Sequence, residues 1–273
     1  MRALRVGIIL LSAAALHGGQ SQDVNGPEII RKSVAVTLAN WKEAPKYAFI
    51  ERDVTSKKNR AKATKTYEVL MIEGSPYNRV IAINDRQLSK EEQDVEEKKL
   101  RGEIEKRQNE SPRDRNRRIA KYQKERSGDL AMMREMSEAF NFKLVSETKV
   151  NGRDAYEFAA TPKPGYVPKN RDTKVLTGMK GTLWVDKGTY QWIKVQAEVI
   201  HPVSFYGVIA KVSPGTRFEL EQEPVAGNLW LPKHFAVRVN ASAFGFINEN
   251  STDDETYSRY RPMSQVESLQ ARK

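Results

Sequence analysis

The chain has 273 residues, a formal net charge of +11 and no cysteine. This length is enough for one large domain or two small ones, and such a domain can bury a core of its own. The lack of cysteine excludes disulfides, thiol catalysis, thiolate metal sites and lipid attachment to a cysteine. The positive charge suits anionic lipid or acidic partners.

The first residues follow the order of a secretory signal. Two arginines within the first five residues precede a short apolar run from Val6 to Leu16, and a pair of glycines follows. This order is typical of a cleaved signal peptide, and the run is about half of the ~20 residues that span a bilayer. We therefore predict a signal peptide over residues 1–21 and a periplasmic location, with a retained membrane anchor as the alternative. Export argues against nucleic acid as a partner.

The segment after the signal predicts a helix followed by strands. Pro27 suits a first helical turn, and apolar residues recur at helical spacing from Ile30 to Trp41, so the helix is expected to end near Lys42. Aromatic and β-branched residues then predict strands over 47–54, 64–73 and 79–84, with a hairpin loop over 56–65.

Residues 88–141 are dense in Lys, Arg and Glu and predict a helical insertion between strands. Ser89 with Glu92 forms a capping box, Ser111 caps a second helix, and a third helix is expected from Gly128 or Asp129. Interspersed charges of both signs are typical of a solvated helix face. The alternative is a binding role for four arginines, namely Arg113, Arg115, Arg117 and Arg118.

From Phe142 onward, alternating apolar and polar residues predict antiparallel strands, and Asn151-Gly152 favours a type I′ hairpin turn. The alternation places Ile193 with Val195 on one dry face, opposite a wet one. A polar turn is expected at 248–255. The strands are predicted at 142–149, 154–161, 182–185, 190–199, 217–222, 235–243 and 256–261. Helices segregated from such a sheet indicate an α+β fold: one β domain over 22–262 around a curved antiparallel sheet, with the insertion at 88–141 and a flexible tail over 263–273.

No pattern of catalytic or metal-binding residues is found. The three histidines, His17, His201 and His234, lack the close spacing of a zinc site. Ser75 lacks the flanking pattern of a hydrolase nucleophile, and Glu219 with Glu221 lies on the wet face of a strand, where a solubilising role is expected. We therefore predict a protein that is not an enzyme and that needs no cofactor or metal.

Aromatic residues concentrate in the C-terminal strands. Core packing accounts for most of them, and the alternative is that they line a concave sheet that holds an apolar ligand. The candidate ligand-binding residues are Trp184, Tyr190, Trp192, Phe218, Leu220, Trp230, Phe235 and Val237.

Two segments resemble the outer-membrane lipoprotein carrier and sorting (LolA/LolB-like) family. The segment from Gly181 to Val195, GTLWVDKGTYQWIKV, is similar to the G-x-L-W-V-D-x-x-T-x-x-I-x-K hairpin of that family, and GNLWLP at 227–232 is similar to its G-x-W-L-P strand entry. The resemblance implies a half-open β-barrel with helices on its concave side and a hydrophobic hollow for lipid chains. The insertion at 88–141 departs from the carrier pattern.

The function expected from the sequence is a non-catalytic periplasmic binding protein that shelters a lipid or lipoprotein acyl chain, as in outer-membrane lipoprotein sorting. Burial of apolar ligand surface, at roughly 25 cal/mol per Å², drives such uptake without a catalytic group. A monomer with transient membrane-surface contact is expected. The alternatives are an envelope structural or regulatory protein that binds a protein partner through the charged insertion, and an undetected hydrolase.

Overall fold

The predicted signal peptide and most of the predicted tail lie outside the residues that the structure describes. The computed structural model describes residues 25–57, 62–170, 172–204, 211–239 and 251–264.

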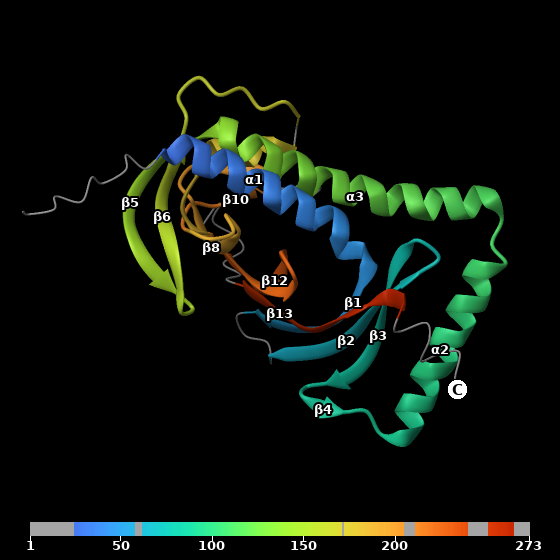
Figure 1. Ribbon diagram of the computed structural model, residues 1–273. Coiled ribbons are helices and arrows are strands. Elements are labelled where there is room, and N and C mark those ends of the chain that lie inside the picture. Colours follow the sequence, from blue (N-terminus) through green and yellow to red (C-terminus); the bar gives the residue numbers. More distant parts are fainter. Residues whose placement is uncertain (1–24, 58–61, 171, 205–210, 240–250, 265–273) are drawn as a thin grey trace, which may run out of the picture.

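Eleven strands of the described chain form one open antiparallel sheet in the order β4-β3-β2-β1-β13-β12-β11-β8-β7-β6-β5. Strands β4 and β5 are its two edges, so the α+β class with a curved, unclosed sheet is confirmed (Figure 1). The strands are β1 (Tyr47–Lys57), β2 (Ala63–Ile72), β3 (Ser75–Ile83), β4 (Arg86–Gln87), β5 (Phe140–Val150), β6 (Arg153–Pro162), β7 (Met179–Asp186), β8 (Trp192–Val199), β11 (Arg217–Ala226), β12 (Leu229–Val239) and β13 (Ser251–Pro262), with a separate pair of β9 (Val203–Ser204) and β10 (Lys211–Val212).

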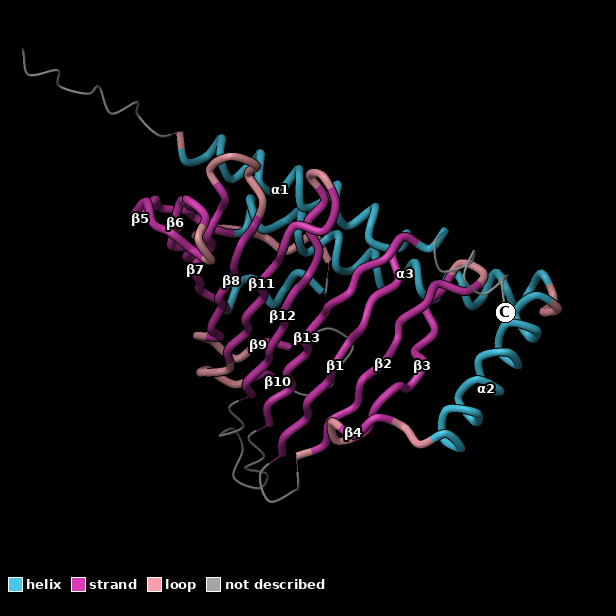
Figure 2. Tube along the Cα trace, turned by 60° about the horizontal axis from the view of Figure 1, so that its bottom comes forward, coloured by secondary structure: helices cyan, strands magenta, loops and turns pink. Residues whose placement is uncertain are grey.

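Three α-helices accompany the sheet in the described chain: α1 (Gly26–Glu43), α2 (Lys90–Gln108) and α3 (Pro112–Ala139). Two short 3₁₀ helices are also present: η1 (Ala44–Lys46) joins α1 to β1, and η2 (Asp172–Gly178) lies between β6 and β7. Figure 1 shows α1 and α3 side by side across the concave side of the sheet, and Figure 2 shows the strands in front of them. Asn25 caps α1 by accepting from the Glu28 backbone N–H, and Ser89 and Ser111 cap α2 and α3 in the predicted way.

The face of the sheet toward α1 is called the inner face. Leu183, Val185 and Trp192 form one buried cluster with Ile30 and Val34 of α1. The Trp192 indole Nε1 donates to Ser33 Oγ of the same helix at 3.1 Å. The contacts with α1 therefore identify the side chains of β7 and β8 that point inward, and alternation assigns the rest of each strand except across a bulge at Ile193.

Helix α2 packs on the opposite, outer face. Its Leu100 forms a buried cluster with Ala48 of β1 and Leu70 of β2. Lys65 of β2 lies on the inner face, because the register across the sheet links it through Asp53 of β1 to the inner-face residue Leu183. Leu70 is five residues further along β2, so alternation places it on the outer face. Because α3 lies on the inner side, beside α1, the insertion passes from one face of the sheet to the other beside the β2–β3 turn. The predicted placement of helices on the concave side holds for α1, and the predicted insertion contributes α3 to that side and α2 to the outer face.

The prediction of two helices after Ser111 is wrong, because α3 is continuous through Gly128. Glycine inside a helix costs only about 1 kcal/mol relative to alanine, which tertiary contacts outweigh here. Just before Gly128, the Arg126 guanidinium donates to the Trp41 carbonyl and lies over the Trp41 ring, so α3 is held against α1 at this point.

Two strand predictions also need correction. The polar segment 251–255 is not a turn, because it belongs to β13 and pairs with both β1 and β12. Ile193 does not share a face with Val195, since β8 has a bulge there that turns Ile193 toward the outer cluster of Ala155 and Trp230. The Asn151-Gly152 turn is confirmed, with positive φ angles of 50° and 79°. A further bulge, at Val145, interrupts the edge strand β5.

Candidate functional site

One row of inner-face side chains crosses the sheet and changes character halfway. Residues directly opposite one another in antiparallel strands share a face. The apolar half of the row runs over β7, β8, β11 and β12, and the polar half continues on β13, β1 and β2. In order, the row is Leu183, Val195, Leu220, Phe235, Glu255, Asp53 and Lys65.

Helices cover the part of the inner face that is formed by strands β5 to β8. Trp192 lies in the α1 cluster, with Tyr190 packed at its margin, and Phe218 packs against a second cluster that includes Val199 and Val175. Tyr190 has a φ of 59° in the β7–β8 turn, and the Lys32 ammonium lies 4.9 Å from its ring centroid. These three predicted residues therefore contribute to the packing of the protein itself.

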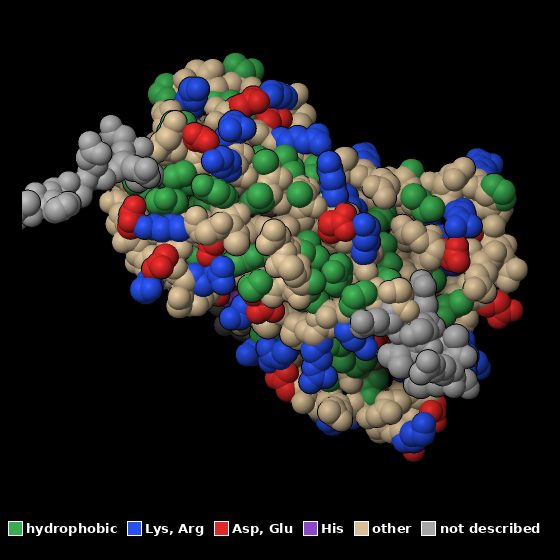
Figure 3. Space-filling model, in the orientation of Figure 1, with side chains coloured by type: hydrophobic (Ala, Val, Ile, Leu, Met, Phe, Trp, Pro, Cys, Tyr) green, Lys and Arg blue, Asp and Glu red, His purple; other side chains and the backbone are tan. Residues whose placement is uncertain are grey.

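The next inner-face residues along the sheet form what we call the inner apolar strip: Leu220, Phe235 and Val237. They lie on the neighbouring strands β11 and β12, with Phe235 opposite Leu220 and Val237 opposite Phe218. All three are half-buried, and they belong to none of the four core clusters formed by the described residues. On the side seen in Figure 3, hydrophobic side chains reach the surface between patches of Lys and Arg.

The two remaining predicted residues point the other way. Trp184 and Trp230 pack on the outer face with Ala155 and Ile193. Trp230 is 2% exposed, and the Arg153 guanidinium lies 4.9 Å from its ring centroid. The sequence placed all eight candidates together, whereas the pleat of the sheet divides them between two faces.

Acidic side chains occupy the inner face beside the strip. Asp253 lies opposite Val237, and Glu255 lies opposite both Phe235 and Asp53. Glu51 shares this face, because it is two residues before Asp53 on β1. Burial, together with the charges of Asp53 and Glu255, raises the pKa of Glu51 to about 8, and burial also raises the pKa values of Asp53 and Glu255. The Tyr257 hydroxyl donates to the Glu255 carboxylate.

These carboxyl groups predict a pH-dependent stability. The pKa of Glu51 is near 4.5 when unfolded and about 8 when folded, so the folded state binds more protons between these values. Stability is therefore expected to fall as the pH rises from about 5 to 8, by at most about 1.4 kcal/mol per pH unit for this one group. Urea unfolding at several pH values would show a flatter profile in Glu51→Gln, and identical slopes would contradict the assignment.

The described residues offer no group of three or more His, Asp or Glu side chains arranged to hold a metal ion. On the outer face His234 Nε2 lies 3.0 Å from the Asp254 carboxylate, and Glu219 and Glu221 both accept from the Lys194 ammonium, at 2.8 and 2.9 Å. His201 is exposed. His234, Glu219 and Glu221 thus each have a charged partner on the outer face.

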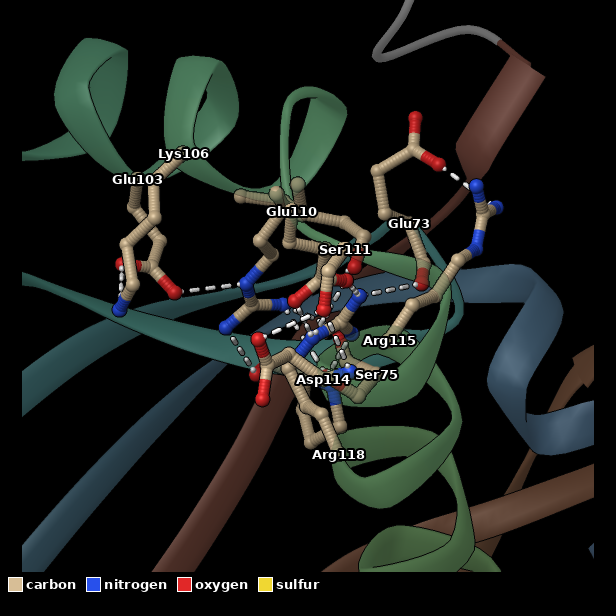
Figure 4. Close-up of polar contacts among 12 residues, drawn as sticks. Glu73, Ser75, Glu103, Lys106, Glu110, Ser111, Asp114, Arg115 and Arg118 are labelled. Atoms are coloured by element: carbon tan, nitrogen blue, oxygen red, sulfur yellow. Dashed lines mark hydrogen bonds and ion pairs between the residues drawn. The ribbon is translucent and has the colours of Figure 1, made fainter.

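The arginines of the insertion divide into anchors and exposed residues. The Arg118 guanidinium donates to Ser75 Oγ at 2.7 Å and to the Glu73 carbonyl at 3.1 Å, and Arg115 donates to the Glu73 carboxylate at 2.8 Å (Figure 4). Arg113 and Arg117 remain exposed. Two of the four predicted binding arginines therefore hold the start of α3 to the β2–β3 turn.

Arg107 completes this attachment, and sequence reasoning missed it. Its side chain is 6% exposed. Its guanidinium donates to the Ile72, Ser75 and Pro76 carbonyls and to Ser75 Oγ, and its Nε donates to Glu103 at 2.7 Å. We call Arg107 and Arg118 with Ser75 the helix–turn anchor. The signal in the sequence is spacing, since Arg107 follows the apolar Leu100 and Ile104 on one helix face.

No family model matches the chain, and no curated protein matches it. Solved structures do match. They include a LolA superfamily protein from Nitrosomonas europaea, with 11% identity over 86% of this chain and 91% of that chain and a TM-score of 0.33.

Two further matches have the same character. A DUF1329 family protein from Desulfovibrio piger has 12% identity over 85% of this chain and 91% of its own, with a TM-score of 0.33. A chain of the MucA/MucB complex of Pseudomonas aeruginosa has 11% identity over 86% and 98%, with a TM-score of 0.23. No helix among the described residues is long and apolar enough to span a membrane.

Proposed function

We propose that this protein is a non-catalytic binding protein of the cell envelope, exported to the periplasm, that shelters an acyl chain against the inner face of its sheet. The observation that carries the proposal is the inner apolar strip. Leu220, Phe235 and Val237 form an apolar surface on β11 and β12. In the described chain, none of these three residues belongs to a core cluster with α1, α2 or α3.

The energetics favour an acyl chain as the guest. Each methylene moved from water to an apolar surface contributes about 0.8 kcal/mol, so ten methylenes contribute about 8 kcal/mol before the costs of ordering. That is on the order of micromolar affinity at best. No reacting group is required for such uptake. The acidic groups next to the strip would favour a chain whose polar end is neutral or cationic over one that ends in a free anion.

A charge placed on the strip is expected to weaken uptake. Phe235→Glu and Val237→Glu would each weaken binding of a fluorescent long-chain alcohol by at least about tenfold, because a carboxylate must be desolvated to admit the chain. The measurement is a fluorescence titration of the exported, full-length protein. Circular dichroism and urea unfolding would establish that each variant folds.

Val145→Glu is the matched control. Val145 is 57% exposed on the edge strand β5, far along the sheet from the strip, and the same charge there should leave the affinity unchanged. An affinity that is equal in all variants, or a wild-type protein that binds no acyl probe while it retains a protein partner through residues 88–141, would overturn the proposal in favour of a partner-binding envelope protein.

A further inference from the structure

The outer face of the sheet carries a groove that is separate from the inner apolar strip. It has a volume of about 430 Å³ and crosses five strands: β6, β7, β8, β11 and β12. Small residues such as Ala159, Thr182 and Ala236 contribute to its lining. These residues alternate with the inner-face row, and the register places Ala159 opposite Thr182 and Ala236 opposite Glu219. The groove therefore opens away from α1.

One end of the groove is defined by a row of charged side chains on successive strands. Lys180 lies opposite Glu198, Glu198 lies opposite Arg217, and Arg217 lies opposite Arg238. All four line the groove. Like charges directly opposite one another destabilise a pair of strands, so the Arg217–Arg238 juxtaposition is a cost that packing does not explain.

Other basic residues of the same face are neutralised. Arg153 donates to Asp186 at 2.6 Å, Arg52 donates to Asp85 at 2.7 Å, and Lys194 is held by two glutamates. By contrast, Lys180, Arg217 and Arg238 have no carboxylate within ion-pair distance among the residues that the structure describes. Of the two carboxylates in the groove, Glu219 is already bound to Lys194, which leaves Glu198 against three cations.

We propose that this groove binds a phosphate group, with Arg217 and Arg238 as its principal ligands and Lys180 as a third cation. A tetrahedral anion accepts from several donors at once, and guanidinium groups suit it because each can donate through two N–H groups. An anion between Arg217 and Arg238 also removes their mutual repulsion. The phosphate could be free or part of a lipid headgroup, and both sources present the same anion to the row.

The test compares two double variants with equal loss of charge. Arg217→Gln/Arg238→Gln removes the row, whereas Arg113→Gln/Arg117→Gln removes two exposed cations from α3. Inorganic phosphate is titrated by NMR chemical shift at low salt, and sedimentation with phosphatidylglycerol vesicles is compared with phosphatidylcholine vesicles. The groove variant is expected to bind at least about tenfold more weakly, since it loses the charged hydrogen bonds of two guanidinium groups, while the α3 variant changes little.

The outcomes separate clearly. Selective loss with inorganic phosphate assigns a free anion, and selective loss with vesicles alone assigns a lipid headgroup. Equal weakening in both double variants, or no binding of either probe by the wild type, overturns the site. Without phosphate, Arg238→Gln should unfold at an equal or higher urea concentration than the wild type, because it relieves the like-charge pair. Since the row lies on the outer face, binding of the acyl probe to the inner apolar strip should be the same in both double variants.

Discussion

Replacing Arg107 by alanine is expected to destabilise the protein by about 3–5 kcal/mol, because the buried guanidinium is the donor for three carbonyls, Ser75 Oγ and the Glu103 carboxylate. Removal leaves the Ile72, Ser75 and Pro76 carbonyls without this donor at the turn between β2 and β3, while Ser75 Oγ still accepts from Arg118. Urea unfolding would give the loss, and hydrogen exchange would place it in α2 and the β2–β3 turn.

Two comparisons sharpen this expectation. Arg113→Ala removes the same charge from an exposed position of α3 and should change stability by no more than about 0.5 kcal/mol. Arg107→Lys keeps the charge but loses the planar fork that reaches several acceptors, so it should remain clearly destabilised. If Arg107→Ala proved as stable as Arg113→Ala, the helix–turn anchor would not hold the insertion in place.

Replacing Asp186 by alanine is expected to cost about 2–4 kcal/mol. One oxygen of this buried carboxylate accepts from the Gly188 and Thr189 backbone N–H groups and from Thr189 Oγ1, and the other accepts from Arg153 at 2.6 Å. Loss of these charged hydrogen bonds opens the β7–β8 turn and leaves Arg153, which covers Trp230, without its partner. Thermal and urea unfolding measure the effect.

The Asp186 prediction has its own control and pH dependence. Asp154 forms an exposed ion pair with Lys149, and Asp154→Ala should cost at most about 1 kcal/mol. Although burial raises the pKa of Asp186, the hydrogen bonds from Arg153 and Thr189 hold it below its ordinary value. Its contribution is therefore present at neutral pH and is lost as the pH falls through the acidic range, so wild type and Asp186→Ala should converge in acid.

Short sequence motifs correctly predicted the features that depend only on neighbouring residues. The Ser89–Glu92 capping box begins α2 as predicted, and Asn151-Gly152 forms its turn, because each depends only on neighbouring residues. The alternating segments likewise predicted antiparallel strands, because the alternation of apolar and polar residues is a property of each single strand. The order of strands and the face that each residue occupies depend on register, and one bulge is enough to reverse the side of Ile193.

The acidic part of the inner face could not be predicted from the sequence pattern. Asp253 and Glu255 lie in a run of polar residues that favours a turn, since Asp and Glu are depleted in strands. Only pairing of β13 with both β1 and β12 shows that this run is a central strand. Arg107 was similarly hidden, because a charged residue in a charged helix resembles its solvated neighbours until the packing of Leu100 is known.

The bulge at Val145 has a consequence for the solubility of the whole sheet. An open sheet ends in unpaired backbone groups, which can recruit a strand from another molecule. At one edge β4 has only two residues, and helix α2 contacts the neighbouring strand β3. At the other, β5 is long, but the bulge breaks its hydrogen-bonding ladder, and exposed Lys143 adds repulsion between copies. Both borders therefore discourage edge-to-edge stacking, which allows so wide a sheet to remain open without growing into fibrils.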